Sequence, residues 1–110
     1  RVGIVAQLGT ALALGAAGML CFEADVAPEL CGAVTSAFAA GDEARFGASL
    51  ARLLRLNEVL SRFGNPRSVK AAMRLRGLPA GELRRPYLAL DDDEVAAISE
   101  VLTAVGLAKP

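Results

Sequence analysis

Residues 15–30, GAAGMLCFEADVAPEL, organise the predicted fold of this chain. Gly15 and Gly18 bracket a tight turn, and the apolar run 19–22 that follows has the length of a buried strand. Pro28 stands where a helix can begin, because its fixed φ suits the first turn and its missing N–H costs nothing there. Helix, glycine turn, buried strand and helix form the repeating unit of a parallel α/β fold.

No other segment predicts a strand as clearly. A lone parallel strand cannot satisfy its own backbone N–H and C=O groups, so its neighbours are expected to lie elsewhere. Hydrophobic residues make up 54% of the 110 residues, and the mean hydropathy is +0.42. A small domain has a high surface-to-volume ratio and needs less apolar content than this. We therefore expect a piece of something larger, with one face covered by absent segments.

The composition disfavours several classes of function. Twelve basic residues balance twelve acidic residues, so no global field recruits nucleic acid or an anionic membrane. The sequence has no histidine, which is the commonest general base and metal ligand. The two cysteines, Cys21 and Cys31, are expected to be small buried hydrophobes and not a disulfide or a metal site. We therefore expect no metal, no cofactor and no nucleic-acid partner.

The first 22 residues imitate a secretory signal, with Arg1 before an apolar stretch. Gln7 and Thr10 interrupt that stretch, which also contains four glycines. A spanning helix needs about 20 predominantly apolar residues. We therefore expect a cytoplasmic protein without a membrane partner, and a membrane-tethered helical protein stays open as an alternative.

Local end signals predict five helices. Each begins at a capping residue or a helix-favouring run and ends near a glycine. They cover residues 6–14, ended by Gly15; about 26–39, capped by Asp25; 42 to about 62, capped by Asp42; from Pro66, capped by Asn65, to Gly77; and the run after 91–94 to Gly106. Residues 23–25 and 78–90 are expected to be loops.

Charged side chains allow alternative interpretations. The arginines of the longest helix suggest a basic stripe for nucleic acid, but a solvated face with local pairs such as Glu58 with Arg62 is favoured. The carboxylate run 91–94 suggests a metal or acid–base cluster, but its place before an apolar helix favours a helix start. Lys70 is flanked by cations at helical spacing, and an ordinary surface lysine is favoured over a Schiff-base lysine.

The order of several motifs resembles the C-terminal part of the dihydrodipicolinate synthase and N-acetylneuraminate lyase family. Residues 15–30 resemble its last barrel strand and the loop after it, in the form Gly-x-x-Gly, apolar strand, Ala-Asn-x-x-Pro. The other motifs follow in the family's order: Gly41-Asp42 before a Leu-rich helix, Asn65-Pro66 with Val69-Lys70-Ala71, Gly77-Leu78, Arg85-Pro86 with Leu88 and Leu90, and Val105-Gly106-Leu107.

The resemblance implies a mostly α chain, the C-terminal fragment of a (β/α)8 TIM barrel with its last strand or two, plus a C-terminal helical extension. Residues 1–40 would be the end of the barrel (seventh-strand remnant, helix, eighth strand, helix) and 41–110 the extension. Family members are lyases of the class I aldolase type, which use a lysine Schiff base with pyruvate. That lysine belongs to the sixth strand, upstream of Arg1, and Lys70 matches the extension lysine. We therefore expect no catalytic residue and no activity from this chain alone.

Two substrate-binding positions are implied by the resemblance, and only for the intact parent protein. Gly3 matches the seventh-strand glycine that lies against bound pyruvate, and Leu20 matches the apolar residue that packs on the Schiff-base adduct. Asp25 replaces the family's usual Asn, and Ile4 and Val5 follow Gly3 where the family commonly has an Asp. These departures leave the substrate of the parent open.

The implied partners are pyruvate or another 2-oxo acid in the parent, together with the missing N-terminal part of the barrel or further copies in a homo-oligomer. An independent, non-catalytic helical interaction or oligomerisation module is the alternative, because an oily surface marks a partner surface.

Overall fold

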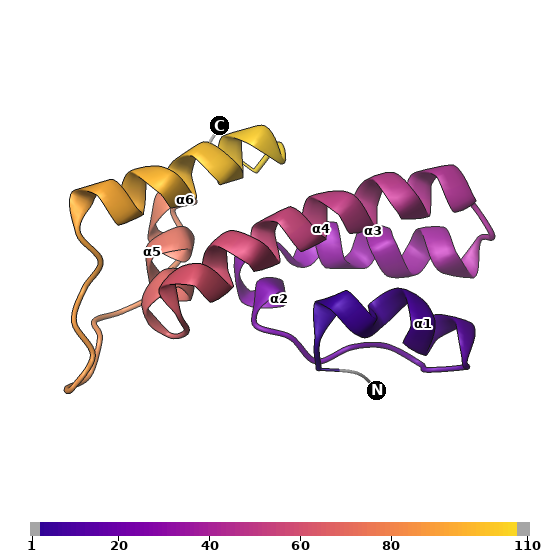
Figure 1. The fold of residues 1–110 in the computed structure, drawn as a ribbon, viewed down its shortest axis with the longest axis horizontal. Helices are drawn as coiled ribbons and strands as arrows, with labels where there is room; N and C mark the ends of the chain where they lie inside the picture. Colours follow the sequence, from indigo (N-terminus) through magenta and orange to yellow (C-terminus); the bar gives the residue numbers. More distant parts are fainter. Residues whose placement is uncertain (1–2, 108–110) are drawn as a thin grey trace. The chain divides into compact units, whose positions relative to one another are not determined.

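The computed structural model describes residues 3–107, most of them in helices (Figure 1). The chain divides into two compact units, one ending at Leu54 and the other beginning at Arg55. The boundary falls inside the longest helix, α4 (Glu43–Phe63). Among the described residues, no helix has both the length and the apolar character that crossing a bilayer requires.

The first unit begins with a short 3-10 turn, η1 (Val5–Gln7), and continues into α1 (Leu8–Ala13). This segment matches the predicted first helix. Gly15, with φ of 92°, follows α1, and this left-handed conformation suits a residue without a Cβ. The predicted end of this helix is therefore confirmed.

The predicted strand at 19–22 is not formed. Residues 16–21 are extended or irregular, only Met19 takes part in a single bridge, and residues 3–107 contain no strand. A strand exists only when a neighbour accepts its backbone hydrogen bonds, so an apolar run alone cannot make one. The seventh-strand remnant was predicted to begin at Arg1, which lies outside the described residues.

Residues 23–25, predicted as a loop, instead open the short helix α2 (Glu23–Val26). Its turns close through the Asp25 N–H on the Phe22 carbonyl oxygen, at 3.1 Å, and the Ala27 N–H on the Glu23 carbonyl oxygen, at 2.8 Å. Asp25 lies inside this helix and therefore does not cap the next one. That next helix, α3 (Pro28–Ala39), begins at Pro28 as predicted, with Ala27 as its N-cap and no side-chain cap.

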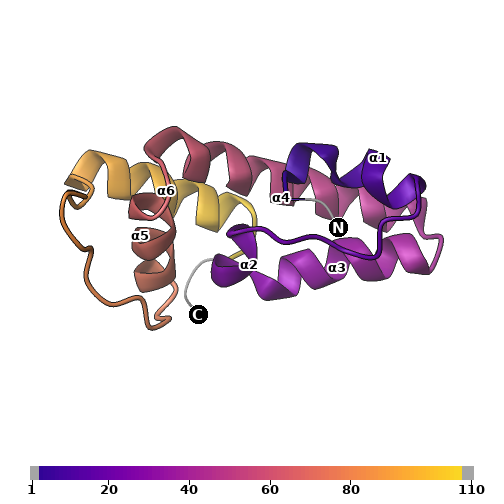
Figure 2. The same ribbon diagram turned by 90° about the horizontal axis from the view of Figure 1, so that it is seen from below.

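The helices α3 and α4 form an antiparallel hairpin, and Figures 1 and 2 both show α3 beside the first part of α4. Gly41, with φ of 69°, makes the turn between them. Asp42 caps α4 as predicted, because its Oδ1 accepts the Arg45 N–H at 3.0 Å. The buried core of this unit is aliphatic: Val5, Leu8, Leu12, Val26, Ala27, Leu30, Val34, Ala37 and Leu53.

The second unit contains the last part of α4, α5 (Arg67–Leu75) and α6 (Asp92–Ala104). Its core consists of Leu56, Val59, Leu60, Val69, Ala72, Ile98, Leu102, Val105 and Leu107. The fully buried Ser68 Oγ donates a hydrogen bond of 2.7 Å to the Leu60 carbonyl oxygen, which ties α5 to α4.

The predicted cap of α5 is wrong. The N-cap is Pro66, without a side-chain hydrogen bond, and Asn65 lies one residue earlier in the turn. Gly64, with φ of 81°, reverses the chain first, and Asn65 and Pro66 complete that turn before helical bonding begins.

Residues 78–90 form the predicted loop, because none of them lies in a helix or strand. Asp91 then caps α6 in a capping box: its Oδ1 accepts the Glu94 N–H at 2.8 Å, and the Asp91 N–H donates to Glu94 Oε1 at 3.1 Å. Gly106, with φ of 77°, follows α6, so both predicted ends of this helix are confirmed.

Candidate functional site

Gly3 and Leu20, the two positions implied to face the substrate, are neighbours in the structure. A Cβ built on Gly3 would lie 3.6 Å from the Leu20 carbonyl oxygen, which is ordinary van der Waals contact. The segments before α1 and before α2 therefore run close together here. Their role in binding a substrate stays a prediction.

The side chain of Leu20 is open to solvent. It is 76% exposed, although leucine is a residue that proteins usually bury. Ile4 and Leu14 in the same unit are 58% and 84% exposed. The described residues therefore leave most of these apolar side chains exposed.

Next to Leu20, the two thiols and one carboxylate form a connected cluster. Cys21 lies close enough to Glu23 and to Cys31 for both groups to affect the pKa of its thiol. Both cysteines are free; Cys31 is buried and Cys21 is half-buried. Burial raises the pKa of Cys21 and raises that of Cys31 from 9.0 to about 12. Both thiols are therefore protonated at neutral pH.

Glu23 is the residue of this cluster that sequence reasoning missed. Glu23 is 1% exposed, although glutamate is rarely fully buried. The sequence placed Glu23 in a loop, which implies exposure. No signal in the sequence indicated burial, because the short helix α2 that buries Glu23 was not predicted.

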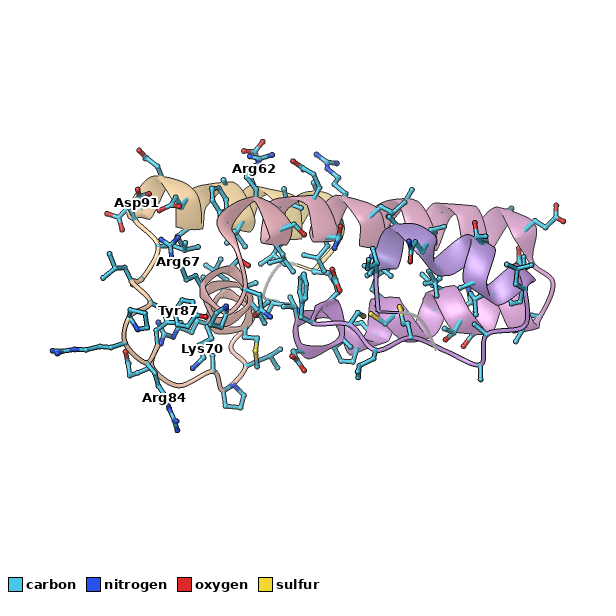
Figure 3. All side chains as sticks on the ribbon, turned by 60° about the horizontal axis from the view of Figure 1, so that its bottom comes forward. Arg62, Arg67, Lys70, Arg84, Tyr87 and Asp91 are labelled. Carbon is cyan, nitrogen blue, oxygen red and sulfur yellow. The ribbon has the colours of Figure 1, made fainter. Side chains whose placement is uncertain are left out.

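Three cationic side chains of α5 bind the loop that follows it. Arg67 Nε donates to the Leu88 carbonyl oxygen at 2.6 Å, and Lys70 Nζ donates to the Glu82 carbonyl oxygen at 2.6 Å. Arg74 donates to the Gly81 carbonyl oxygen. Figure 3 shows Arg67 and Lys70 projecting from α5 near this loop. The ammonium group of Lys70 therefore has a structural role, because it holds the loop against α5.

A hollow of about 230 Å³ lies between α5 and this loop. The three cations line it together with apolar side chains, among them Ala71, Leu75, Leu83, Leu90 and Val95. Because each cation already donates to a backbone carbonyl, the positive charge holds the loop and is not presented as a free anion site.

The charged residues of α4 and the carboxylate run 91–94 have local structural roles. Arg62 pairs with Glu58 on α4, as predicted, and both side chains are more than half exposed. Within residues 3–107, no three carboxylates or thiols converge in a way that fits a metal ion. The carboxylate run at 91–94 begins α6, as its capping box shows.

A second hollow, of about 380 Å³, lies in the first unit between α1 and the turn of the α3–α4 hairpin. Phe38 and Phe46 line it with their ring centroids 5.6 Å apart, and Asp42 and Glu43 line it as well.

A helical architecture of this kind, with two extended segments meeting at Gly3 and Leu20, is that of the C-terminal end of a (β/α)8 barrel with its helical extension. The sequence matches the model of the dihydrodipicolinate synthetase family over residues 3–105. The chain belongs to the dihydrodipicolinate synthetase family. The fold class and the resemblance inferred from the sequence are thus confirmed.

Individual relatives agree with this assignment. A DapA-like lyase of Halobacterium salinarum is 39% identical over 100 residues, which cover 91% of this chain and 33% of the relative. A 4-hydroxy-tetrahydrodipicolinate synthase of Symbiobacterium thermophilum is 36% identical over 96 residues, 87% of this chain and 33% of the relative. The chain therefore spans about a third of the length of these curated relatives.

The solved structure of YagE, a prophage protein of this family from E. coli K12 in complex with pyruvate, has a similar fold. The match covers 96% of this chain and 36% of YagE, with a TM-score of 0.85 and 24% sequence identity. At this identity the likeness shows a shared fold.

Proposed function

We propose that this chain is the C-terminal segment of a pyruvate-dependent lyase or aldolase that works through a lysine Schiff base. In this proposal residues 1–40 close the barrel and residues 41–110 form the helical extension. The chain supplies part of the wall of the pyruvate pocket and no catalytic residue, so it is inactive alone.

The proximity of the Gly3 backbone to the Leu20 carbonyl oxygen supports this proposal. In a barrel of this class the active site lies at the C-terminal ends of the strands, and these two residues occupy the corresponding ends by resemblance. A glycine leaves room for a small 2-oxo acid beside the backbone. An exposed leucine supplies the apolar surface that the methyl group of pyruvate needs.

The chemistry requires an amine that this segment does not provide. A Schiff-base lysine needs a lowered pKa, and it must reach the carbonyl carbon of the substrate. Lys70 lies in the other compact unit from Leu20 and donates to the Glu82 carbonyl oxygen. The proposal therefore assigns the reactive lysine to the part of the barrel that precedes Arg1.

A chimera tests the proposal. This chain replaces the matching segment of the Symbiobacterium thermophilum synthase, and pyruvate is added with borohydride to trap any Schiff base. We expect a covalent adduct on a lysine of the N-terminal part and none on the isolated chain. An adduct on Lys70, or a folded chimera without an adduct, would contradict the proposal.

Substitution of the pocket residue sharpens this test. In the chimera, Leu20→Ala removes an apolar contact of about 1.4 kcal/mol, so the KM for pyruvate should rise about tenfold. Leu14→Ala is the matched control, because Leu14 is equally apolar and exposed but lies at the end of α1. Equal effects of the two substitutions would show that Leu20 does not face the substrate.

A helical interaction or oligomerisation module is a second candidate, favoured by the exposed Ile4, Leu14 and Leu20. Here the apolar side chains would be covered by further copies of the chain or by the missing part of the barrel. Light scattering after size exclusion tests self-association, which should grow with protein concentration and weaken in an Ile4→Lys variant. A compact monomer at all concentrations would contradict self-association.

A further inference from the structure

We propose that the hollow of about 380 Å³ in the first unit binds a small organic ammonium ion with an apolar body, such as an arylalkylammonium. Its lining combines two aromatic rings with two carboxylates and, among residues 3–107, includes no cationic side chain. All of the residues that line it belong to the first compact unit. They include neither Gly3 nor Leu20, so the site stands independently of the proposed pyruvate pocket.

Small residues create the space in this hollow. Gly9 and Ala13 line it from α1, and Gly41 lines it from the turn after α3. A Cβ on Gly9 would meet Leu50 Cδ2 at 3.8 Å and Phe46 Cζ at 3.9 Å, which is ordinary contact. Helix packing therefore does not demand a glycine at this position. The volume lies within the range of about 300–1,000 Å³ that is typical of pockets for small molecules.

Two phenylalanine rings form the apolar wall. Phe38 lies near the end of α3 and Phe46 near the start of α4, with their ring planes tilted by 59°. Phe38 remains 39% exposed, so part of its ring is open to a ligand. The carbon atoms of the rings can pack against an apolar ligand body, and their negative faces attract a nearby cation.

The two carboxylates determine which charge the hollow prefers. Asp42 and Glu43 are both exposed and line the hollow, and Asp42 Oδ1 also accepts the Arg45 N–H at 3.0 Å as the cap of α4. The start of a helix carries about half a positive charge, which two full negative charges outweigh. An ammonium group is therefore attracted to the hollow, whereas a carboxylate or phosphate group is repelled.

A titration of the full chain followed by NMR amide shifts tests the proposal. The probes are phenethylammonium, the neutral phenethyl alcohol and the anionic phenylpropionate, which share one aromatic body. We expect phenethylammonium to bind with a Kd on the order of 1 mM, with shifts confined to residues 9–13 and 37–46. The alcohol should bind more weakly and the anion should not bind. No binding of phenethylammonium, equal binding of the three probes, or shifts elsewhere would overturn the proposal.

Ala13→Leu tests the hollow itself. Ala13 is exposed and leucine favours helices, so this variant should fold while its larger side chain fills part of the space. Phenethylammonium should then bind several-fold more weakly. Ala51→Leu is the matched control, because Ala51 is an exposed alanine of the same unit that does not line the hollow. Equal affinities of the two variants would contradict binding in the hollow.

Two charge substitutions separate electrostatics from folding. Glu43→Gln preserves the shape of the side chain, and Asp42→Asn preserves the cap, because asparagine caps helices about as well as aspartate. An exposed ion pair contributes at most about fivefold in affinity, so the double variant should bind phenethylammonium about tenfold more weakly. Phenethyl alcohol should bind the double variant and the unaltered chain equally. An unchanged affinity for the ammonium ion, or an equal loss for the alcohol, would refute the role of the carboxylates.

Discussion

Asp91→Ala is expected to destabilise α6 by a predictable amount. The substitution removes an acceptor that binds the Glu94 N–H at 2.8 Å, and it ends the reciprocal bond of the capping box. Loss of an N-cap costs about 1 kcal/mol, and loss of a negative charge at the helix start costs about 0.5 kcal/mol more. The total is about 1.5 kcal/mol.

Urea denaturation followed by far-UV circular dichroism measures this loss. With a slope of about 2 kcal/mol per molar urea, the midpoint should fall by about 0.7 M while the slope is unchanged. Asp92→Ala is the matched control, because Asp92 lies one residue further along in the first turn and does not cap the helix. It should cost only about 0.5 kcal/mol, the contribution of the charge.

Asp91→Asn separates hydrogen bonding from charge. Asparagine caps helices about as well as aspartate, so this variant should resemble Asp92→Ala. If Asp92→Ala or Asp91→Asn proved as damaging as Asp91→Ala, the capping argument would be wrong. A large rise in the thermal midpoint with added Mg²⁺ would instead favour the metal interpretation of the carboxylate run 91–94.

Three further predictions concern other contacts. Ser68→Ala removes the buried hydrogen bond to the Leu60 carbonyl oxygen and should cost about 1 kcal/mol, measured by the same urea titration. Because burial raises the pKa of Cys31 from 9.0 to about 12, its stabilising contribution is complete below pH 9 and is lost as pH rises toward 12, at up to about 1.4 kcal/mol per pH unit. Cys31→Ala should flatten that slope in urea titrations between pH 8 and 11. Lys70→Met removes the bond to the Glu82 carbonyl oxygen, so limited trypsin digestion should cut the loop after α5 several-fold faster, and Lys70→Arg should restore protection.

The sequence predicted the parts of the fold that local chemistry determines. Gly41 and Asp42 mark the turn and the cap of α4, and Asp91 marks the start of α6, because each effect acts within a few residues. The same holds for Pro28 at the start of α3.

Predictions failed where distant parts of the chain decide the structure. The run 19–22 has strand composition, but a strand needs partners that residues 3–107 do not supply. Asp25 has the chemistry of a cap, but the short helix α2 already encloses it. Gly3 and Leu20 were named through the family resemblance, and only the folded chain places them together. The link of Glu23 to the two thiols depends on burial, which no local signal encodes.

Cationic side chains of α5 hold the loop that follows it by hydrogen bonds to backbone carbonyl oxygens. Arg67 and Lys70 hold carbonyl oxygens at Leu88 and Glu82, and a carbonyl oxygen is present whatever side chain the residue carries. The loop sequence is therefore free to change at Leu88, whereas the carboxylate of Glu82 also lies 3.7 Å from Arg74, so that position keeps a preference for an acidic residue. Substitutions should therefore be tolerated better at loop residues that accept only through their carbonyl oxygen than at the cationic residues of α5 that donate to them.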